Sequence, residues 1–375
     1  RRAATVTVVL AVVMTVVCTV VMLDLRIGDL DPGAPELRQD SRYNKDGAYI
    51  TAHYGLSSDQ FVVIMTNPDD GCRLYGTLQL MDQLAQTLRE TEGVQATSSL
   101  AQSTRFITAA LNEGSGKWLT ISRDQGITNA AVGAAMIATP DITNTSCAVS
   151  PLIAYLADHK ADTLNRVLKV SEAFAAKNNS ANPKEGPQFL LAAGSAGVEA
   201  ATNIEVERGI FLMYLAVYGA TALLCLLTFR SVRATIVAMI PLVMTTIICK
   251  ALMVWMGIGL KVATLPVIAV GVGVGVDYAL YLLSVQITLQ RRGATLAEAY
   301  RKSLDFTGRV VALVGLTMAA GVITWAWSPI KFQADMGILL TFMFLWNMLG
   351  ALVLIPALSH FLLNPQQTKS HLPTY

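Results

Sequence analysis

One acidic residue, Asp277, interrupts a long apolar stretch of the sequence. The stretch reads VATLPVIAVGVGVGVDYALYLLSVQ over residues 262–286, and Asp277 is its only charge between Ala263 and Ser284. A helix of this length, at about 1.5 Å per residue, can cross a hydrocarbon core of about 30 Å. A carboxylate near its middle costs at least about 2.5–3.5 kcal/mol on insertion scales, and such residues usually have a function. Because apolar surroundings favour the neutral acid, Asp277 is a candidate for binding and releasing a proton.

Three glycines, Gly271, Gly273 and Gly275, precede Asp277 within two helical turns. They leave little side-chain bulk, so a neighbouring helix can pack closely or water can enter. The alternative interpretation is that Asp277 only hydrogen-bonds a neighbouring helix and that the glycines are a packing face.

Three other polar residues in apolar stretches could cooperate with Asp277. Lys250 lies about two turns from a helix end, which favours snorkelling over a direct pair with Asp277. Tyr278 points about 100° away from Asp277 around the helix, so it either relays a proton or only packs. Thr317 either hydrogen-bonds Asp277 or donates to its own helix.

Other kinds of chemistry lack support in the sequence. A net charge of +2 gives no reason to expect nucleic acid as a partner. The glycines have no strand-turn-helix context, and no phosphate-binding lysine loop is present. We therefore predict no catalytic site, no metal site and no cofactor. The histidines, which lack the spacing of metal ligands, are His53, His159, His360 and His371.

The composition is that of a membrane protein, with 53% hydrophobic and 14% charged residues among 375. The chain begins with Arg1 instead of Met, so we expect a fragment or one half of a longer protein. Six apolar stretches approach or exceed the length of a membrane span. They are Ala3–Leu23, Gly209–Phe229, Ala234–Met256, 262–286, Val310–Trp327 and Met336–Leu363.

Basic residues are distributed unevenly among the connections between these stretches. With the N-terminus inside, the two short outer connections carry only Lys261 and Lys331. The positive-inside rule then predicts six crossings, both termini in the cytoplasm and the large polar region outside. Leu296–Leu304 is predicted to be a short basic amphipathic helix on the inner surface. The basic residues of the inner segments are Arg1, Arg2, Arg230, Arg233, Arg291, Arg292, Arg301, Lys302, Arg309 and Lys369.

The polar region between the first two apolar stretches contains two β-α-β patterns, which predict a split, ferredoxin-like arrangement. Between them, Ser99–Asp141 has no clear pattern, and its Lys117-Trp118 and Ser122-Arg123-Asp124 predict an ordered loop or short helix. Cys72 and Cys147 lie in this region and can form a disulfide if it is extracytoplasmic, whereas the other cysteines are expected in the apolar core. The predicted strands and helices are Phe61–Thr66, Leu74–Thr91, Val94–Leu100, Ala148–Leu156, Ala161–Lys177 and Gln188–Ala192.

This order of segments resembles one half of a transporter of the RND superfamily, closest to the exporters with MMPL and hopanoid-transporter-like members. The string GVGVGVDYALYL carries the likeness, supported by Phe229-Arg230-Ser231 and Ile240-Pro241-Leu242. The resemblance implies a six-span α-helical bundle with an extracytoplasmic α+β porter domain. The implied divisions are a first transmembrane helix at 1–25, a porter domain at 26–206, a five-helix block at 207–363 and a cytoplasmic tail at 364–375.

The resemblance also implies a function. Asp277 and Tyr278 would be one of two Asp-Tyr pairs that couple proton entry to export of hydrophobic, amphiphilic or lipid-like molecules across the bacterial inner membrane. The expected partners are membrane lipids, a matching N-terminal half or second copy, and a periplasmic or outer-membrane protein, within a dimer or trimer. The alternatives are a sterol-sensing-domain-like lipid sensor without transport and a proton-driven auxiliary of protein translocation. The sequence does not identify the cargo.

Overall fold

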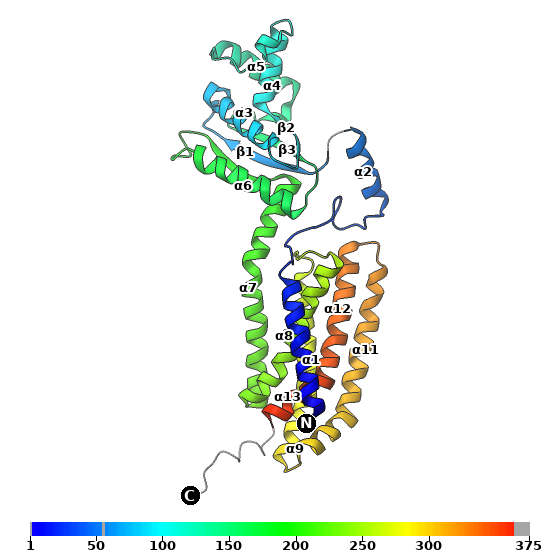
Figure 1. The fold of residues 1–375 in the computed structure, drawn as a ribbon. Coiled ribbons are helices and arrows are strands. Elements are labelled where there is room, and N and C mark those ends of the chain that lie inside the picture. Colours follow the sequence, from blue (N-terminus) through cyan, green and yellow to red (C-terminus); the bar gives the residue numbers. More distant parts are fainter. Residues whose placement is uncertain (1, 55–56, 364–375) are drawn as a thin grey trace. The chain divides into compact units, whose positions relative to one another are not determined.

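The structure, a computed structural model, describes residues 2–54 and 57–363, and the predicted tail at 364–375 lies outside the described residues (Figure 1). The chain divides into two compact units. The helical unit contains residues 2–30, 35–38 and 206–363. The α/β unit contains residues 31–34, 39–54 and 57–205.

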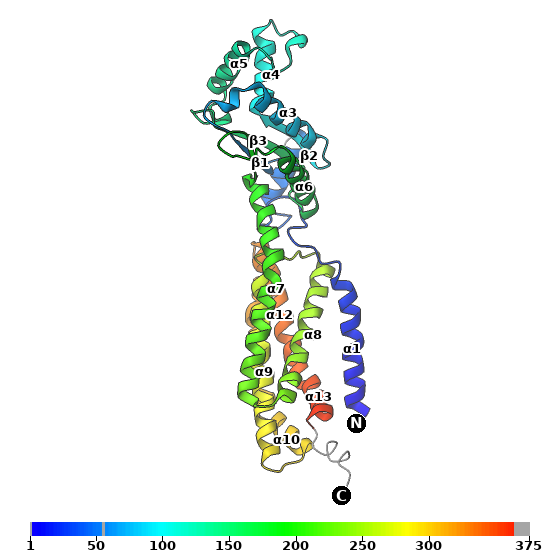
Figure 2. The same cartoon turned by 90° about the vertical axis from the view of Figure 1, so that its left-hand side faces the viewer.

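All six apolar stretches of the sequence are helical, as predicted. In the described part of the chain, six helices are long and apolar enough to cross a membrane, two of them built from several consecutive segments. Figures 1 and 2 show them as a bundle of roughly parallel rods. They are α1 (Arg2–Met22), α7 (Gly194–Phe229), α8 (Val232–Met256), α9 (Leu265–Arg291), the run of α10 (Leu296–Ser303) and α11 (Arg309–Ile323), and the run of α12 (Lys331–Leu349) and α13 (Ile355–Leu362).

Two of these spans contain a π-helical turn, η4 (Leu304–Gly308) and η6 (Gly350–Leu354). The predicted short helix at Leu296–Leu304 exists as α10, but it continues through η4 into α11 instead of standing alone. The hydroxyl of Tyr300 on α10 donates to the Leu352 carbonyl of η6 at 2.8 Å. The hydroxyl of Ser303 donates to the Leu282 carbonyl of α9 at 3.0 Å. These bonds hold α10 on the bundle.

Local chemistry sets the ends of α8 and α9. The hydroxyl of Ser231 caps α8 by accepting from the Ala234 amide, and Gly257 ends the helix in the left-handed conformation with φ +67°. Pro266 lies in the first turn of α9, where a missing amide hydrogen costs nothing.

The α/β unit is a four-stranded sheet with two crossover helices. The sheet order is β2-β3-β1-β4, and all neighbours are antiparallel. Each β-α-β unit has one strand of the other unit between its own two strands, which is a split arrangement. All six predicted segments form within two residues of their predicted ends. They are β1 (Gln60–Thr66), α3 (Tyr75–Arg89), β2 (Val94–Ser99), β3 (Val149–Leu156), α6 (Ala161–Asn178) and β4 (Gln188–Ala193).

The structure contains helices that the sequence patterns did not indicate, namely α2 (Arg42–Tyr54), α4 (Leu100–Leu111) and α5 (Gln125–Ala138). Lys117-Trp118 lies in the short helix η2 (Gly116–Trp118) and Ser122–Asp124 is a loop, in agreement with the prediction for these residues, whereas the remainder of 99–141 is mostly helical. The buried faces of α4 and α5 consist largely of alanine and threonine. Buried threonines of α4 donate to carbonyls of their own helix, which lets a polar residue take a core position. A search for large apolar residues misses such a face.

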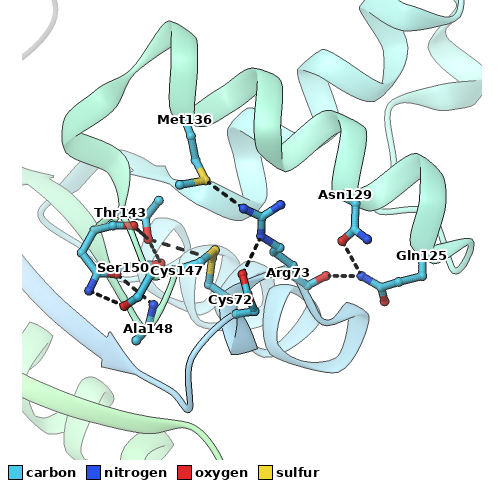
Figure 3. Close-up of polar contacts among 12 residues, drawn as sticks. Cys72, Arg73, Gln125, Asn129, Met136, Thr143, Cys147, Ala148 and Ser150 are labelled. Atoms are coloured by element: carbon cyan, nitrogen blue, oxygen red, sulfur yellow. Dashed lines mark hydrogen bonds and ion pairs between the residues drawn. A yellow bond between two sulfur atoms is a disulfide. The ribbon is translucent and has the colours of Figure 1, made fainter.

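Cys72 and Cys147 form a disulfide, with Cα atoms 5.3 Å apart (Figure 3). Cys72 lies in η1 (Gly71–Arg73) after β1, and Cys147 lies two residues before β3. The bridge therefore joins the segment that leaves one central strand to the segment that enters its neighbour. Of the other cysteines, Cys225 and Cys249 are buried as expected, whereas Cys18 is only half-buried.

Arg73 connects the disulfide region to α5 (Figure 3). Its guanidinium pairs with Asp70 at 3.2 Å and contacts the sulfur of Met136 at 3.8 Å. Its carbonyl accepts a hydrogen bond from the Gln125 side chain at 3.0 Å. Arg73 thus contacts both the first turn of α5, through Gln125, and its last turn, through Met136, and so holds α5 next to the disulfide.

Candidate functional site

One face of α9 packs against helices of the same chain. Gly271 and Gly275 are buried on this face. A methyl group added at Gly275 would lie about 2.5–2.6 Å from Asn347 of α12 and Leu242 of α8, and one at Gly271 would collide with Met343 of α12. These two glycines therefore allow close helix packing within the described chain.

The opposite face of α9 is open. Asp277 and Gly273 are exposed there, with Val270 45% and Tyr281 55% exposed on the same stripe. The spacing of three to four residues places all four on one helix face. Apart from its sequence neighbours and the backbone of its own helix, no described atom lies within 4 Å of a Cβ placed at Gly273. Within the described chain no helix packs on Gly273, so a packing role for this glycine stays a prediction.

Asp277 lies near the middle of α9, and no hydrogen bond or ion pair joins it to another described residue. Lys250 lies over the ring of Tyr214 at 4.3 Å, a cation–π contact. Thr317 donates to the carbonyls of Leu313 and Val314 of its own helix. The structure thus brings neither Lys250 nor Thr317 to Asp277, and for Thr317 it shows the own-helix alternative.

Tyr278 points into the bundle, away from Asp277. It is 1% exposed and belongs to a core cluster formed by residues of α7, α8, α9, α11, α12, η6 and α13. Its hydroxyl is buried and has no hydrogen-bond partner among the described residues. The two neighbours in sequence therefore face different surroundings, as the rotation of 100° per residue predicts.

Asn347 is a polar residue of this region that the sequence reasoning did not single out. It is buried, and its amide nitrogen donates to the Gly271 carbonyl at 2.8 Å, joining α12 to α9. Its oxygen has no partner among the residues that the structure describes. The signal was available, because an amide within the uncharged stretch 336–363 is a typical interhelical hydrogen-bonding group.

A cluster of polar contacts lies at the end of the bundle where α1 and α8 end and α9 and α12 begin. Lys261 pairs with Asp29 at 2.5 Å, and Lys331 pairs with Asp335 at 3.5 Å. Arg38 donates to the carbonyls of Ser328 and Ala326. The segment after α1 is thus bound to the α8–α9 and α11–α12 connections.

These two lysines are the only basic residues predicted for the short outer connections, and both are ion-paired. Within residues 2–54 and 57–363, no three His, Cys, Asp or Glu side chains gather in a way that could hold a metal ion.

A family model described as the MMPL family matches residues 50–365, which is most of the chain. The chain belongs to the MMPL family. Membership of the MMPL family agrees with the resemblance of the sequence to the RND superfamily. The family and the six apolar helices together indicate a multi-pass membrane protein. Members of the family are transporters and not enzymes, which indicates transport of the RND type here. A comparison of the chain with curated proteins gives no match.

Proposed function

We propose that this MMPL protein uses the proton-motive force to export hydrophobic, amphiphilic or lipid-like molecules, and that Asp277 binds and releases the proton. One observation carries the proposal. A carboxyl group in the middle of a membrane-spanning helix lies on an open face, without a partner in the described chain. A charge facing hydrocarbon is costly, so such a residue faces a polar or watery path in the working assembly.

The open stripe of α9 is the surface on which a second bundle would complete that path. Gly273 lies one turn before Asp277 and offers no side-chain bulk, so another helix can approach the carboxyl group closely. The partner in this proposal is a matching N-terminal half or a second copy of the chain. Tyr278 lies on the buried side of α9, where it packs in the core of the bundle. A proton relay through its hydroxyl stays a prediction.

Neutralising Asp277 would lower the cost of apolar surroundings and allow the helices to repack. The helix α7 begins directly after β4 and continues into a membrane span, so it can carry such a change toward the α/β unit. The driving force is adequate. One charge crossing 100 mV is worth about 2.3 kcal/mol, and each pH unit adds about 1.4 kcal/mol.

In the proposed topology the protein lies in the bacterial inner membrane, with the α/β unit as a periplasmic porter domain. The Cys72–Cys147 bridge supports this, because disulfides persist in oxidising compartments. The uneven distribution of basic residues supports the same orientation.

The test is export from energised membrane vesicles containing Asp277→Asn, with a lipophilic fluorescent substrate. We expect export to be lost while membrane insertion and folding are retained. Asp305→Asn, the same chemical change in η4, is the matched control and should export normally. Undiminished export by Asp277→Asn would overturn the proposal. Lipid binding that does not depend on the proton gradient would favour the alternative of a lipid sensor. Accumulation of secretory precursors in cells depleted of the protein would favour the alternative of a translocation auxiliary.

A further inference from the structure

A groove that shares no residue with the open stripe of α9 lies between α1, α7 and α8. Its volume is about 400 Å³, within the range of about 300–1,000 Å³ found for ligand sites. In both views α8 lies between α7 and α1 (Figures 1 and 2). The lining includes Thr15 of α1, Ala222 of α7 and one face of α8 with Ile236, Ile240, Val243 and Ile247.

The lining of this groove offers no free hydrogen-bonding group. Its two hydroxyls donate to carbonyls of their own helices, Thr15 to Ala11 at 2.8 Å and Thr235 to Ser231 at 3.2 Å. All other lining side chains are apolar. The part of a ligand that lies here is therefore hydrocarbon.

The length of the groove matches one leaflet of a bilayer. From Thr235 to Ile247 it follows α8 for about 18 Å at 1.5 Å per residue. Half of a hydrocarbon core of about 30 Å is about 15 Å. A single acyl chain that enters from one membrane surface would fill the groove over most of its length.

The two ends of the groove differ in the charge they offer. Arg233 is exposed one turn before Ile236, on the same face of α8, and Arg230 is exposed just before α8 begins. No ion pair or side-chain hydrogen bond joins either arginine to another described residue. At the deep end, Lys250 lies over the Tyr214 ring, so its charge is already engaged. Free positive charge is thus concentrated where a lipid headgroup would lie.

We propose that this groove binds one acyl chain of an anionic glycerophospholipid from the surrounding leaflet, with the headgroup phosphate against Arg233 and Arg230. The site is independent of proton coupling, so Asp277→Asn should leave lipid occupancy unchanged. A basic residue near a membrane surface contributes about fivefold to the affinity for an anionic lipid. The proposal therefore predicts a headgroup preference as well as chain binding.

The test is native mass spectrometry of the full chain in detergent, titrated with phosphatidylglycerol or phosphatidylcholine of identical chains. We expect a one-to-one adduct that prefers phosphatidylglycerol. Arg233→Gln should reduce that preference about fivefold. Arg292→Gln, which removes another exposed arginine at the end of α9, is the matched control and should not change it. Equal binding of both lipids by the unaltered protein, or equal effects of the two arginine variants, would overturn the proposal.

A second pair of variants tests the groove itself. Ala222→Phe would fill it and should abolish the adduct with either lipid. Leu223→Phe places the same ring on the exposed side of α7 and should retain the adduct. Circular dichroism and size-exclusion profiles check that both variants fold. Full lipid occupancy in a folded Ala222→Phe protein would show that the lipid binds elsewhere and would reject the site.

Discussion

The two faces of α9 differ although they belong to one helix and carry alternate residues of one short string. On one face Gly271, Gly275 and Tyr278 are buried against helices of the same chain. On the other, Gly273 and Asp277 are exposed and unpartnered within the described residues. The first face is part of how this chain folds, whereas the second is left open by the described chain and is where we propose assembly and proton movement. Similar residue types therefore serve different purposes according to the face on which they lie.

The largest effect on folding should come from Tyr278, the biggest side chain of the buried face. We expect Tyr278→Ala to lower the free energy of unfolding by about 3–5 kcal/mol, as for other large-to-small core changes. Tyr278→Phe should be nearly neutral for stability, because the hydroxyl it removes has no partner among the described residues. Unfolding in mixtures of dodecyl sulfate and a mild detergent measures both. A loss of transport by a stable Tyr278→Phe protein would assign the hydroxyl a role in the proton path.

The glycines give the most direct comparison of the two faces. Gly275→Leu would push against Asn347 and Leu242 and should destabilise the bundle by about 1–3 kcal/mol. A Cβ added at Gly273 contacts no neighbouring helix of the described chain, so Gly273→Leu should change the free energy of unfolding by less than about 0.5 kcal/mol. If the open face binds another bundle, Gly273→Leu should instead weaken assembly, measured by cross-linking in membranes. Equal destabilisation by the two variants would contradict the distinction between the faces.

Asn347 should have a smaller effect, limited to one hydrogen bond between α12 and α9. We expect Asn347→Leu to cost about 0.6–1 kcal/mol, because interhelical hydrogen bonds in membranes contribute modestly. The same detergent titration measures this. A cost above that of Gly275→Leu would indicate that the amide has a role beyond packing.

Asp277 should have the smallest effect on folding. Asp277→Asn breaks no contact with a described residue, so the free energy of unfolding of the isolated chain should stay within about 0.5 kcal/mol. Transport, in contrast, should be lost. A strong destabilisation by this variant would mean that Asp277 holds the fold and would remove the basis for the proposed coupling.

The sequence predicted the elements of both units well, because their signals are periodic and local. Apolar stretches of membrane length predicted the spans. The β-branched run Phe61–Thr66, which ends at a turn signal, predicted one central strand, and the predicted strand Ala148–Leu156 lies beside it in the sheet. The helices α4 and α5 were missed because their buried faces consist largely of alanine and of threonines that donate to carbonyls of their own helix. Such a face has no stripe of large apolar residues that a periodicity search could detect. The cysteines that form the bridge were predicted from their place in a polar region, while their proximity depended on the sheet order.

The sequence alone determined that a carboxyl group lies near the middle of an apolar helix of membrane-spanning length and that Tyr278 points elsewhere, because the rise and rotation of a helix are fixed by backbone geometry. Only the tertiary structure decided which face of α9 its neighbours cover. It also decided that Lys250 lies over the Tyr214 ring and that Thr317 donates to its own helix. Gly273, one turn from Asp277, lies on the face that the described chain leaves uncovered. The physical reason is that periodicity defines which residues share a face, whereas helices far apart in sequence decide what that face meets.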